Sequence, residues 1–125
     1  MKFDQGVVFL YTTDLKRATR FYEGILGLEK VLEQADCRLW RISDDTFIGF
    51  CEKAEPRPKD GVCITLVTDD VDEVCEHLKE NGVPFDKEPE YNPRYDIYNA
   101  FVRDPDGYLV EIQRFESPEW PRKRP

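Results

Sequence analysis

The chain has 125 residues, the size of a single domain, and its 40% hydrophobic and 13% aromatic content is enough to build a packed core. It carries 18 Lys and Arg against 26 Asp and Glu, a formal charge of −8, and an acidic surface repels phosphate backbones, which excludes nucleic acid as a partner. No stretch approaches the ~20 apolar residues of a membrane helix, and the first residues lack the apolar region of a signal peptide. We therefore expect a cytoplasmic protein with no membrane partner.

The first half begins with a short run rich in β-branched and aromatic residues, Gly6 to Tyr11, which predicts a strand. Asp14 follows as a helix N-cap, apolar residues then recur at helical spacing from Leu15 to Leu26, and Gly27 ends the helix. Three further strands are predicted at 28–32, 37–42 and 46–51.

The polar, proline-containing segment 53–61 predicts a linker. After it, a strand is expected at 62–67 and a helix capped by Asp70, with Glu73 completing a capping box and Asn81-Gly82 ending the helix. Three more strands are expected at 83–85, 97–102 and 108–115, with residues 104–107 forming the turn between the last two.

The four cysteines, at positions 37, 51, 63 and 75, include no Cys-x-x-Cys pair, so the spacing indicates neither a zinc knuckle nor a redox pair. In a cytoplasmic protein all four are expected to be free thiols.

The order β-α-β-β-β therefore occurs twice, and an internal repeat of this kind is the strongest organisational signal in the chain. We predict an α+β fold of one domain: module one at about 5–52, the linker 53–61, module two at about 62–116 and a tail at 117–125. Each module is too small to cover both faces of its sheet, so the two are expected to form a curved, cup-like mixed sheet with helices on the outer face.

Three stretches of the repeat resemble one known family: Thr13 to Tyr22 with Leu26-Gly27-Leu28, Val67 to Asp72 with Asn81-Gly82-Val83, and Arg103 to Glu111. The pattern is similar to the vicinal oxygen chelate superfamily, which includes glyoxalase I, extradiol dioxygenases, fosfomycin-resistance transferases and bleomycin-resistance proteins. The resemblance implies the fold. It leaves the function open, because the family holds lyases, isomerases, transferases, dioxygenases and proteins that only bind.

The resemblance also implies four metal-ligand positions, which fall on Val7, Gly49, Cys63 and Glu111. Only Glu111 is a usual ligand, and the single histidine, His77, belongs to the second predicted helix. We therefore expect no family-type metal and no other cofactor. A weakly held divalent ion at Glu111 and Cys63 is the alternative.

Strand alternation predicts which side chains face the inner cavity, while Val8, Leu10, Val110 and Ile112 should pack beneath the helices. By the resemblance, the loop 91–96 corresponds to a segment that closes over ligands. The face occupied by Arg38 and Trp40 is left open. The candidate ligand-binding residues are Phe9, Tyr11, Arg38, Trp40, Phe47, Cys63, Thr65, Tyr95, Glu111 and Gln113.

Three functions are compatible with this pattern. The first is a metal-free binding protein, similar to the bleomycin-resistance proteins, that dimerises and holds a small, partly apolar or aromatic molecule. The second is a lyase, isomerase or dioxygenase-type enzyme in which Glu111 is the catalytic base or a metal ligand. The third is a partner-binding domain that uses an apolar patch at 115–121.

Several of these residues also have a purely structural interpretation. Glu111 could pair with Arg38 or Arg103, and Cys63 could be a small core residue. Phe9, Tyr11 and Phe47 could pack the cavity shut, and Trp40 and Trp120 could lie at a subunit interface.

Overall fold

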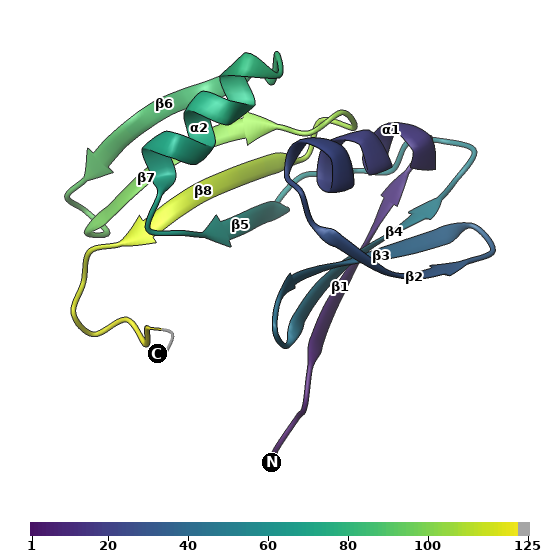
Figure 1. Cartoon of the computed structure of the whole chain (residues 1–125), viewed down its shortest axis with the longest axis horizontal. Coiled ribbons are helices and arrows are strands. Elements are labelled where there is room, and N and C mark those ends of the chain that lie inside the picture. Colours follow the sequence, from purple (N-terminus) through teal and green to yellow (C-terminus); the bar gives the residue numbers. More distant parts are fainter. Residues whose placement is uncertain (123–125) are drawn as a thin grey trace. The chain divides into compact units, whose positions relative to one another are not determined.

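A computed structural model describes residues 1–122, and it divides the chain into two compact units. The first comprises residues 1–60 together with 104–107, and the second comprises 61–103 and the chain from residue 108. Each unit contains a four-stranded mixed sheet with a helical segment (Figure 1), so the predicted α+β class and the two βαβββ modules are confirmed. The division between residues 60 and 61 falls within the segment predicted to be a linker.

The sheet of the first unit has the strand order β1-β4-β3-β2, with β1 parallel to β4 and the other pairs antiparallel. Strand β1 is therefore an edge strand. Every strand was expected from the sequence within two residues of its observed bounds. The strands are β1 (Gly6–Thr12), β2 (Glu29–Gln34), β3 (Cys37–Ser43) and β4 (Thr46–Glu52).

The helical segment of the first unit begins as the short α-helix α1 (Leu15–Thr19) and continues as the π-helix η1 (Arg20–Ile25). Asp14 caps it as predicted, because its carboxylate accepts from the backbone N–H groups of Lys16 and Arg17 at 3.0 and 3.2 Å. Apolar periodicity predicted one α-helix as far as Leu26. The final turns are instead the wider turns of a π-helix, which apolar periodicity does not distinguish from α-helical turns.

The core of the first unit is an aromatic cluster between this helix and the sheet. Tyr22, Trp40 and Phe50 have no exposed surface, and the ring of Tyr22 lies 4.9 Å from Phe50 and 6.0 Å from Trp40. The Trp40 indole N–H donates to Glu23, and the Tyr22 hydroxyl donates to Asp104, in the 104–107 turn that belongs to this unit. The two buried polar groups are thus paired.

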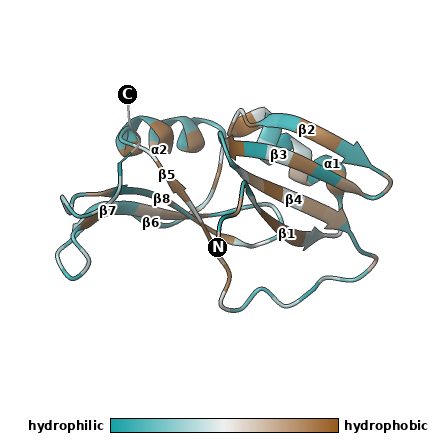
Figure 2. Cartoon of the chain, turned by 90° about the horizontal axis from the view of Figure 1, so that it is seen from below, coloured by the Kyte–Doolittle hydropathy of each residue, from teal (hydrophilic) through white to brown (hydrophobic). Residues whose placement is uncertain are grey.

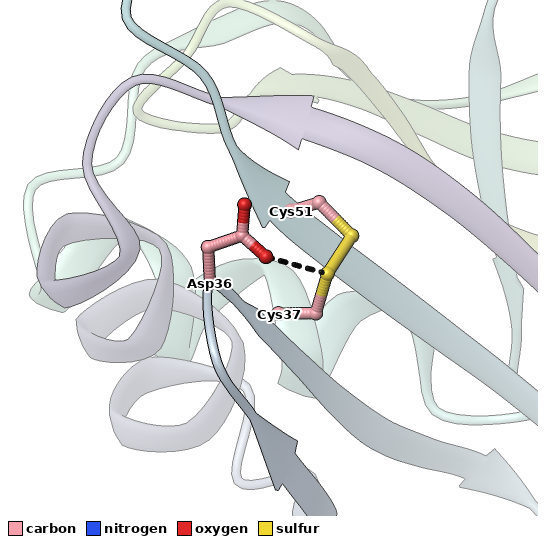
Figure 3. The surroundings of a disulfide bond; sticks show 3 residues. All are labelled: Asp36, Cys37 and Cys51. Carbon is pink, nitrogen blue, oxygen red and sulfur yellow. Dashed lines mark hydrogen bonds between the residues drawn. A yellow bond between two sulfur atoms is a disulfide. The ribbon is translucent and has the colours of Figure 1, made fainter.

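A disulfide joins Cys37 to Cys51 across β3 and β4 (Figure 3). The two residues are register partners with their Cα atoms 4.1 Å apart, and Asp36 Oδ1 lies 3.6 Å from the Cys37 sulfur. The expectation of four free thiols is therefore wrong for this pair and right for Cys63 and Cys75. Local spacing could not reveal the pairing, because it depends on the hairpin register.

The second unit repeats the plan with the strand order β5-β8-β7-β6, in which β5 is parallel to β8. Strand β6 runs seven residues beyond the three-residue strand expected at 83–85. The elements are β5 (Cys63–Val67), α2 (Val71–Glu80), β6 (Phe85–Asn92), β7 (Ile97–Arg103) and β8 (Leu109–Phe115).

Helix α2 alternates hydrophobic and hydrophilic residues (Figure 2) and packs on the sheet with Val71, Cys75 and Leu78 buried. The predicted capping box is wrong in one respect, since the Asp70 side chain makes no capping hydrogen bond. The acidic first turn, Asp72 and Glu73, still lies at the positive end of the helix dipole. Across residues 1–122, the helices are too short and too polar to cross a membrane.

Candidate functional site

The centre of the second sheet holds a carboxylate bound entirely by neutral donors. Glu111 lies on β8, which runs between β5 and β7, and is only 8% exposed. Its Oε1 accepts from the Thr65 hydroxyl at 2.8 Å, and its Oε2 accepts from Asn99 Nδ2 at 2.7 Å and from Gln113 Nε2. A carboxylate accepts about four hydrogen bonds, so most of its capacity is used by the protein itself.

The strand register brings these groups together. Thr65 is paired with Glu111, and Asn99 with Gln113. Since residues two apart on a strand share a face, Glu111 and Gln113 point the same way, while Val110 and Ile112 are buried under α2 as predicted.

Lys87 on β6 fixes the orientation of Asn99. Its ammonium group lies 2.5 Å from Asn99 Oδ1 and 3.3 Å from the Asn99 carbonyl oxygen. Because Lys87 can only donate, it holds the amide oxygen of Asn99 and leaves the amide nitrogen to donate to Glu111. A positive charge is thereby connected to the buried carboxylate through one amide.

A cavity of about 700 Å³ lies over this group of side chains. Aromatic residues supply much of its wall, and the rings of Phe115 and Trp120 are stacked, with centroids 3.7 Å apart. Four predicted site residues, Thr65, Tyr95, Glu111 and Gln113, are brought together here. The remaining lining residues are Val67, Ile97, Phe115 and Trp120.

Cys63 lies at the margin of this group, with its sulfur 3.8 Å from Thr65 Oγ1 and 4.0 Å from Glu111 Oε1. Burial raises the pKa of the Cys63 thiol, and the negative charge of Glu111 raises it further. The thiol therefore stays protonated at neutral pH and is a poor nucleophile.

The structure answers the open question about Arg38 and Trp40. Arg38 donates to Thr19 in the helical segment at 2.7 Å and pairs with Glu33 at 2.8 Å, so it lies on the helix side of its sheet. Trp40 is on the same side and is fully buried. The expectation that Trp40 contacts a ligand is corrected, because its side chain offers no surface. In place of the alternative pairing of Glu111 with Arg38 or Arg103, the structure has the three neutral donors, and Arg103 pairs with Asp86 at 2.7 Å.

The other predicted residues of the first unit lie on the opposite face of its sheet. Phe9 and Tyr11 are 55% and 43% exposed and line a separate hollow of about 440 Å³ beside the disulfide. Phe47 is buried, with the Arg41 guanidinium 5.0 Å above its ring. Val8 is 59% exposed and does not pack beneath the helix as expected, whereas Leu10 is buried.

The four family metal positions do not provide a suitable donor set. Val7 has a hydrocarbon side chain, and a Cβ at Gly49 would stand 2.7 Å from the Phe9 ring. Cys63 offers only a soft sulfur ligand and Glu111 already accepts three hydrogen bonds, so the residues present do not fit the metal that the resemblance implies. Over residues 1–122, no three His, Cys, Asp or Glu side chains are grouped to hold a metal ion.

Sequence reasoning missed Lys87, Asn99, Phe115 and Trp120 as parts of this site. A signal for Asn99 was present in the sequence. Asn99 is the one amide in the strand predicted at 97–102, and it shares a face of that strand with Ile97. Lys87 gave no such signal, because its partner depends on an irregular β6–β7 register.

Comparison with known proteins places the chain among glyoxalase-like sequences. The family model for the glyoxalase/bleomycin resistance protein/dioxygenase superfamily matches residues 5–112. A lactoylglutathione lyase of Salmonella typhimurium is 29% identical over 114 residues, covering 79% of this chain and 83% of that protein.

Solved structures share the fold. A lactoylglutathione lyase from Agrobacterium tumefaciens has a TM-score of 0.73 at 21% identity, covering 91% of this chain and 95% of its own. The fosfomycin resistance protein FosX from Listeria monocytogenes has a TM-score of 0.75 at 20% identity, covering 91% and 94%. A glyoxalase/bleomycin resistance protein/dioxygenase from Nocardioides reaches 0.77 at 16% identity, covering 100% and 91%.

Proposed function

Because this chain belongs to the glyoxalase/bleomycin resistance protein/dioxygenase superfamily, we propose that it binds a small, partly apolar or aromatic molecule in the cavity of its second unit. One observation carries the proposal. Glu111, the residue at a family metal position, is held by three protein donors at the base of an aromatic-walled cavity. This arrangement suits recognition of a ligand by shape and a few fixed polar groups.

Binding without the family metal is part of this proposal. It is supported by the donor set, because Val7 and Gly49 offer no side-chain ligand atom and Glu111 already accepts three hydrogen bonds from the protein. Metal analysis of protein purified without chelators tests it. Stoichiometric, tightly held nickel, manganese, iron or zinc would overturn this part.

Ligand binding can be followed by intrinsic fluorescence, because the two tryptophans differ in position. Trp120 is 40% exposed at the cavity wall and Trp40 is in the core of the first unit. Titration with flat aromatic compounds, 2-naphthol among them, should quench the Trp120 emission. Trp40→Phe is the matched variant that should retain the response, and Trp120→Phe should lose it. A panel that produces no saturable change up to millimolar concentration would contradict the proposal.

An enzyme is the second candidate, favoured by the 29% identity to a lactoylglutathione lyase. In that case Glu111 would act as a general base, or as a ligand for an added divalent ion, in a lyase, isomerase or dioxygenase-type reaction. Turnover that is abolished by Glu111→Gln while ligand affinity is unchanged would favour this candidate over simple binding.

We also propose that the protein forms a homodimer. Edge strand β1 leaves Val7, Val8 and Phe9 between 43% and 59% exposed, and apolar side chains on an edge strand favour association with another chain. Light scattering of the wild type and of Val8→Lys tests this, since the charged variant should shift the protein to monomer. A wild-type protein that is monomeric at high micromolar concentration would refute it.

A cytoplasmic location is the remaining part of the proposal. The Cys37–Cys51 disulfide is more typical of oxidising compartments, so the redox state of this pair in cells is the direct test. Thiol trapping in intact cells should find both cysteines reduced if the protein is cytoplasmic. A fully oxidised pair would contradict that location.

A further inference from the structure

The cavity of the second unit contains a buried acceptor that the protein does not satisfy. Gln113 is 5% exposed and lines the cavity. Within residues 1–122 its side-chain oxygen, Oε1, is buried and has no hydrogen-bond partner. A buried acceptor without a donor is costly, by about 1–3 kcal/mol, and native proteins keep few of them.

The orientation of this amide is determined by its neighbour. Glu111 can only accept hydrogen bonds, so the nitrogen of Gln113, and not its oxygen, must face the carboxylate. The carboxylate is itself positioned by Asn99, whose amide is oriented in turn by Lys87. A chain of hydrogen bonds with a fixed direction therefore runs from the ammonium group of Lys87 to the free oxygen of Gln113. Reversing either amide in this chain would bring two donors or two acceptors together.

Such a chain also strengthens the final acceptor. An amide whose N–H donates to a carboxylate is polarised, which places more negative charge on its oxygen. The other cavity-lining side chains with a donor are Thr65 and Tyr95, through their hydroxyls, and Trp120, through its indole N–H, and none of them donates to this oxygen. The Thr65 hydroxyl is already donated to Glu111.

We propose that Gln113 selects ligands that present an N–H or O–H donor on a flat, aromatic framework. The inference rests on the proposed function, since it names the class of molecule that the same cavity takes. The donor satisfies Gln113 Oε1 while the ring packs against Phe115 and Trp120. Ligands of the same shape that lack the donor leave the oxygen unpaired, as it is in the free protein, and bind less tightly because they do not gain this hydrogen bond.

Entry to this position requires part of the wall to move, because the oxygen has almost no exposed surface. Two lining residues, Tyr95 and Trp120, lie outside the strands, at 61% and 40% exposure. They are the parts of the wall that can shift without breaking the sheet.

The test uses two probes of nearly identical shape, indole, which carries one N–H donor, and benzofuran, in which oxygen replaces that group. Affinities are measured by titration of ¹⁵N-labelled protein in NMR spectra, where the Gln113 side-chain NH₂ signal is identified by its absence in Gln113→Met. Wild type should bind indole about tenfold more tightly than benzofuran. The Gln113 NH₂ signal should shift with indole.

Two variants separate the acceptor from its surroundings. Gln113→Met keeps the side-chain length and removes the oxygen, so the preference for indole should fall to about one. Gln5→Met makes the same substitution at an exposed position outside the cavity, so the preference should persist. Equal binding of both probes to the wild type would overturn the role of Gln113 and leave the proposed function standing. Binding of neither probe, nor of any compound in the panel of flat aromatic compounds, would overturn both.

Discussion

Replacing Glu111 tests whether its carboxylate stabilises the fold by organising the side chains around it. In Glu111→Leu, Asn99 and Gln113, which are 2% and 5% exposed, each lose their acceptor. Each buried, unpaired donor costs about 1–3 kcal/mol, and burial of the leucine side chain recovers roughly 1–2 kcal/mol. We expect the free energy of unfolding to fall by about 3 kcal/mol.

Glu111→Gln is the matched variant. Its amide oxygen can still accept from Asn99 and Gln113, and its nitrogen can donate to Thr65, whose hydroxyl is able to accept instead. The hydrogen bonds persist but lose their charge, so the cost should be only about 1–2 kcal/mol.

Urea unfolding followed by tryptophan fluorescence measures both values. Glu116→Gln, which alters an exposed pair with Arg114, is the control and should lie within about 0.5 kcal/mol of the wild type. The reasoning is refuted if the leucine variant is as stable as the glutamine variant, because the carboxylate would then not organise its neighbours.

Other consequences can be checked on the same protein. Reducing the Cys37–Cys51 disulfide, which closes 14 residues, should lower the free energy of unfolding by about 2–3 kcal/mol in urea titrations with and without reductant; unchanged midpoints would count against it. Burial raises the pKa of Cys75 from 9.0 to about 11. Its stabilising contribution should therefore be complete below pH 9 and decline as the pH rises toward 11, because the unfolded thiol ionises first. Iodoacetamide at pH 8 should accordingly label Cys75 only after unfolding, as peptide mass spectrometry would reveal; rapid labelling of the native protein would show that the thiol is accessible.

The elements predicted best are those whose signals are local. Asp14 caps its helix because an N-cap carboxylate needs only the next three residues, and Gly27 follows with a φ of +73° that L side chains rarely adopt. Asp70 has the same sequence signal but makes no capping bond. The difference shows that a cap motif indicates where a helix begins more reliably than whether the cap side chain hydrogen-bonds to the backbone.

Features that depend on strand register were beyond the sequence. Strand β6 was underestimated because it alternates Lys, Glu and Pro with few apolar residues, which is typical of an edge strand and resembles a loop in composition. The disulfide likewise required knowing that Cys37 and Cys51 are opposite one another in a hairpin. Neither fact follows from residue spacing, since a shift of one residue would reverse every side chain.

The same distinction explains why alternation found part of the site and did not identify the partners of its central residue. Alternation along β5 and β8 correctly placed Thr65, Glu111 and Gln113 on one face. It could not identify what satisfies Glu111, because Asn99 donates to it from a third strand and is itself held by Lys87 from a fourth. An isolated carboxylate at a metal position suggests a ligand or a base. A carboxylate with three neutral donors instead fixes the orientation of the amides around it. Here the amide of Gln113 donates to the carboxylate, so the group left to bind a ligand is the unpaired oxygen of Gln113.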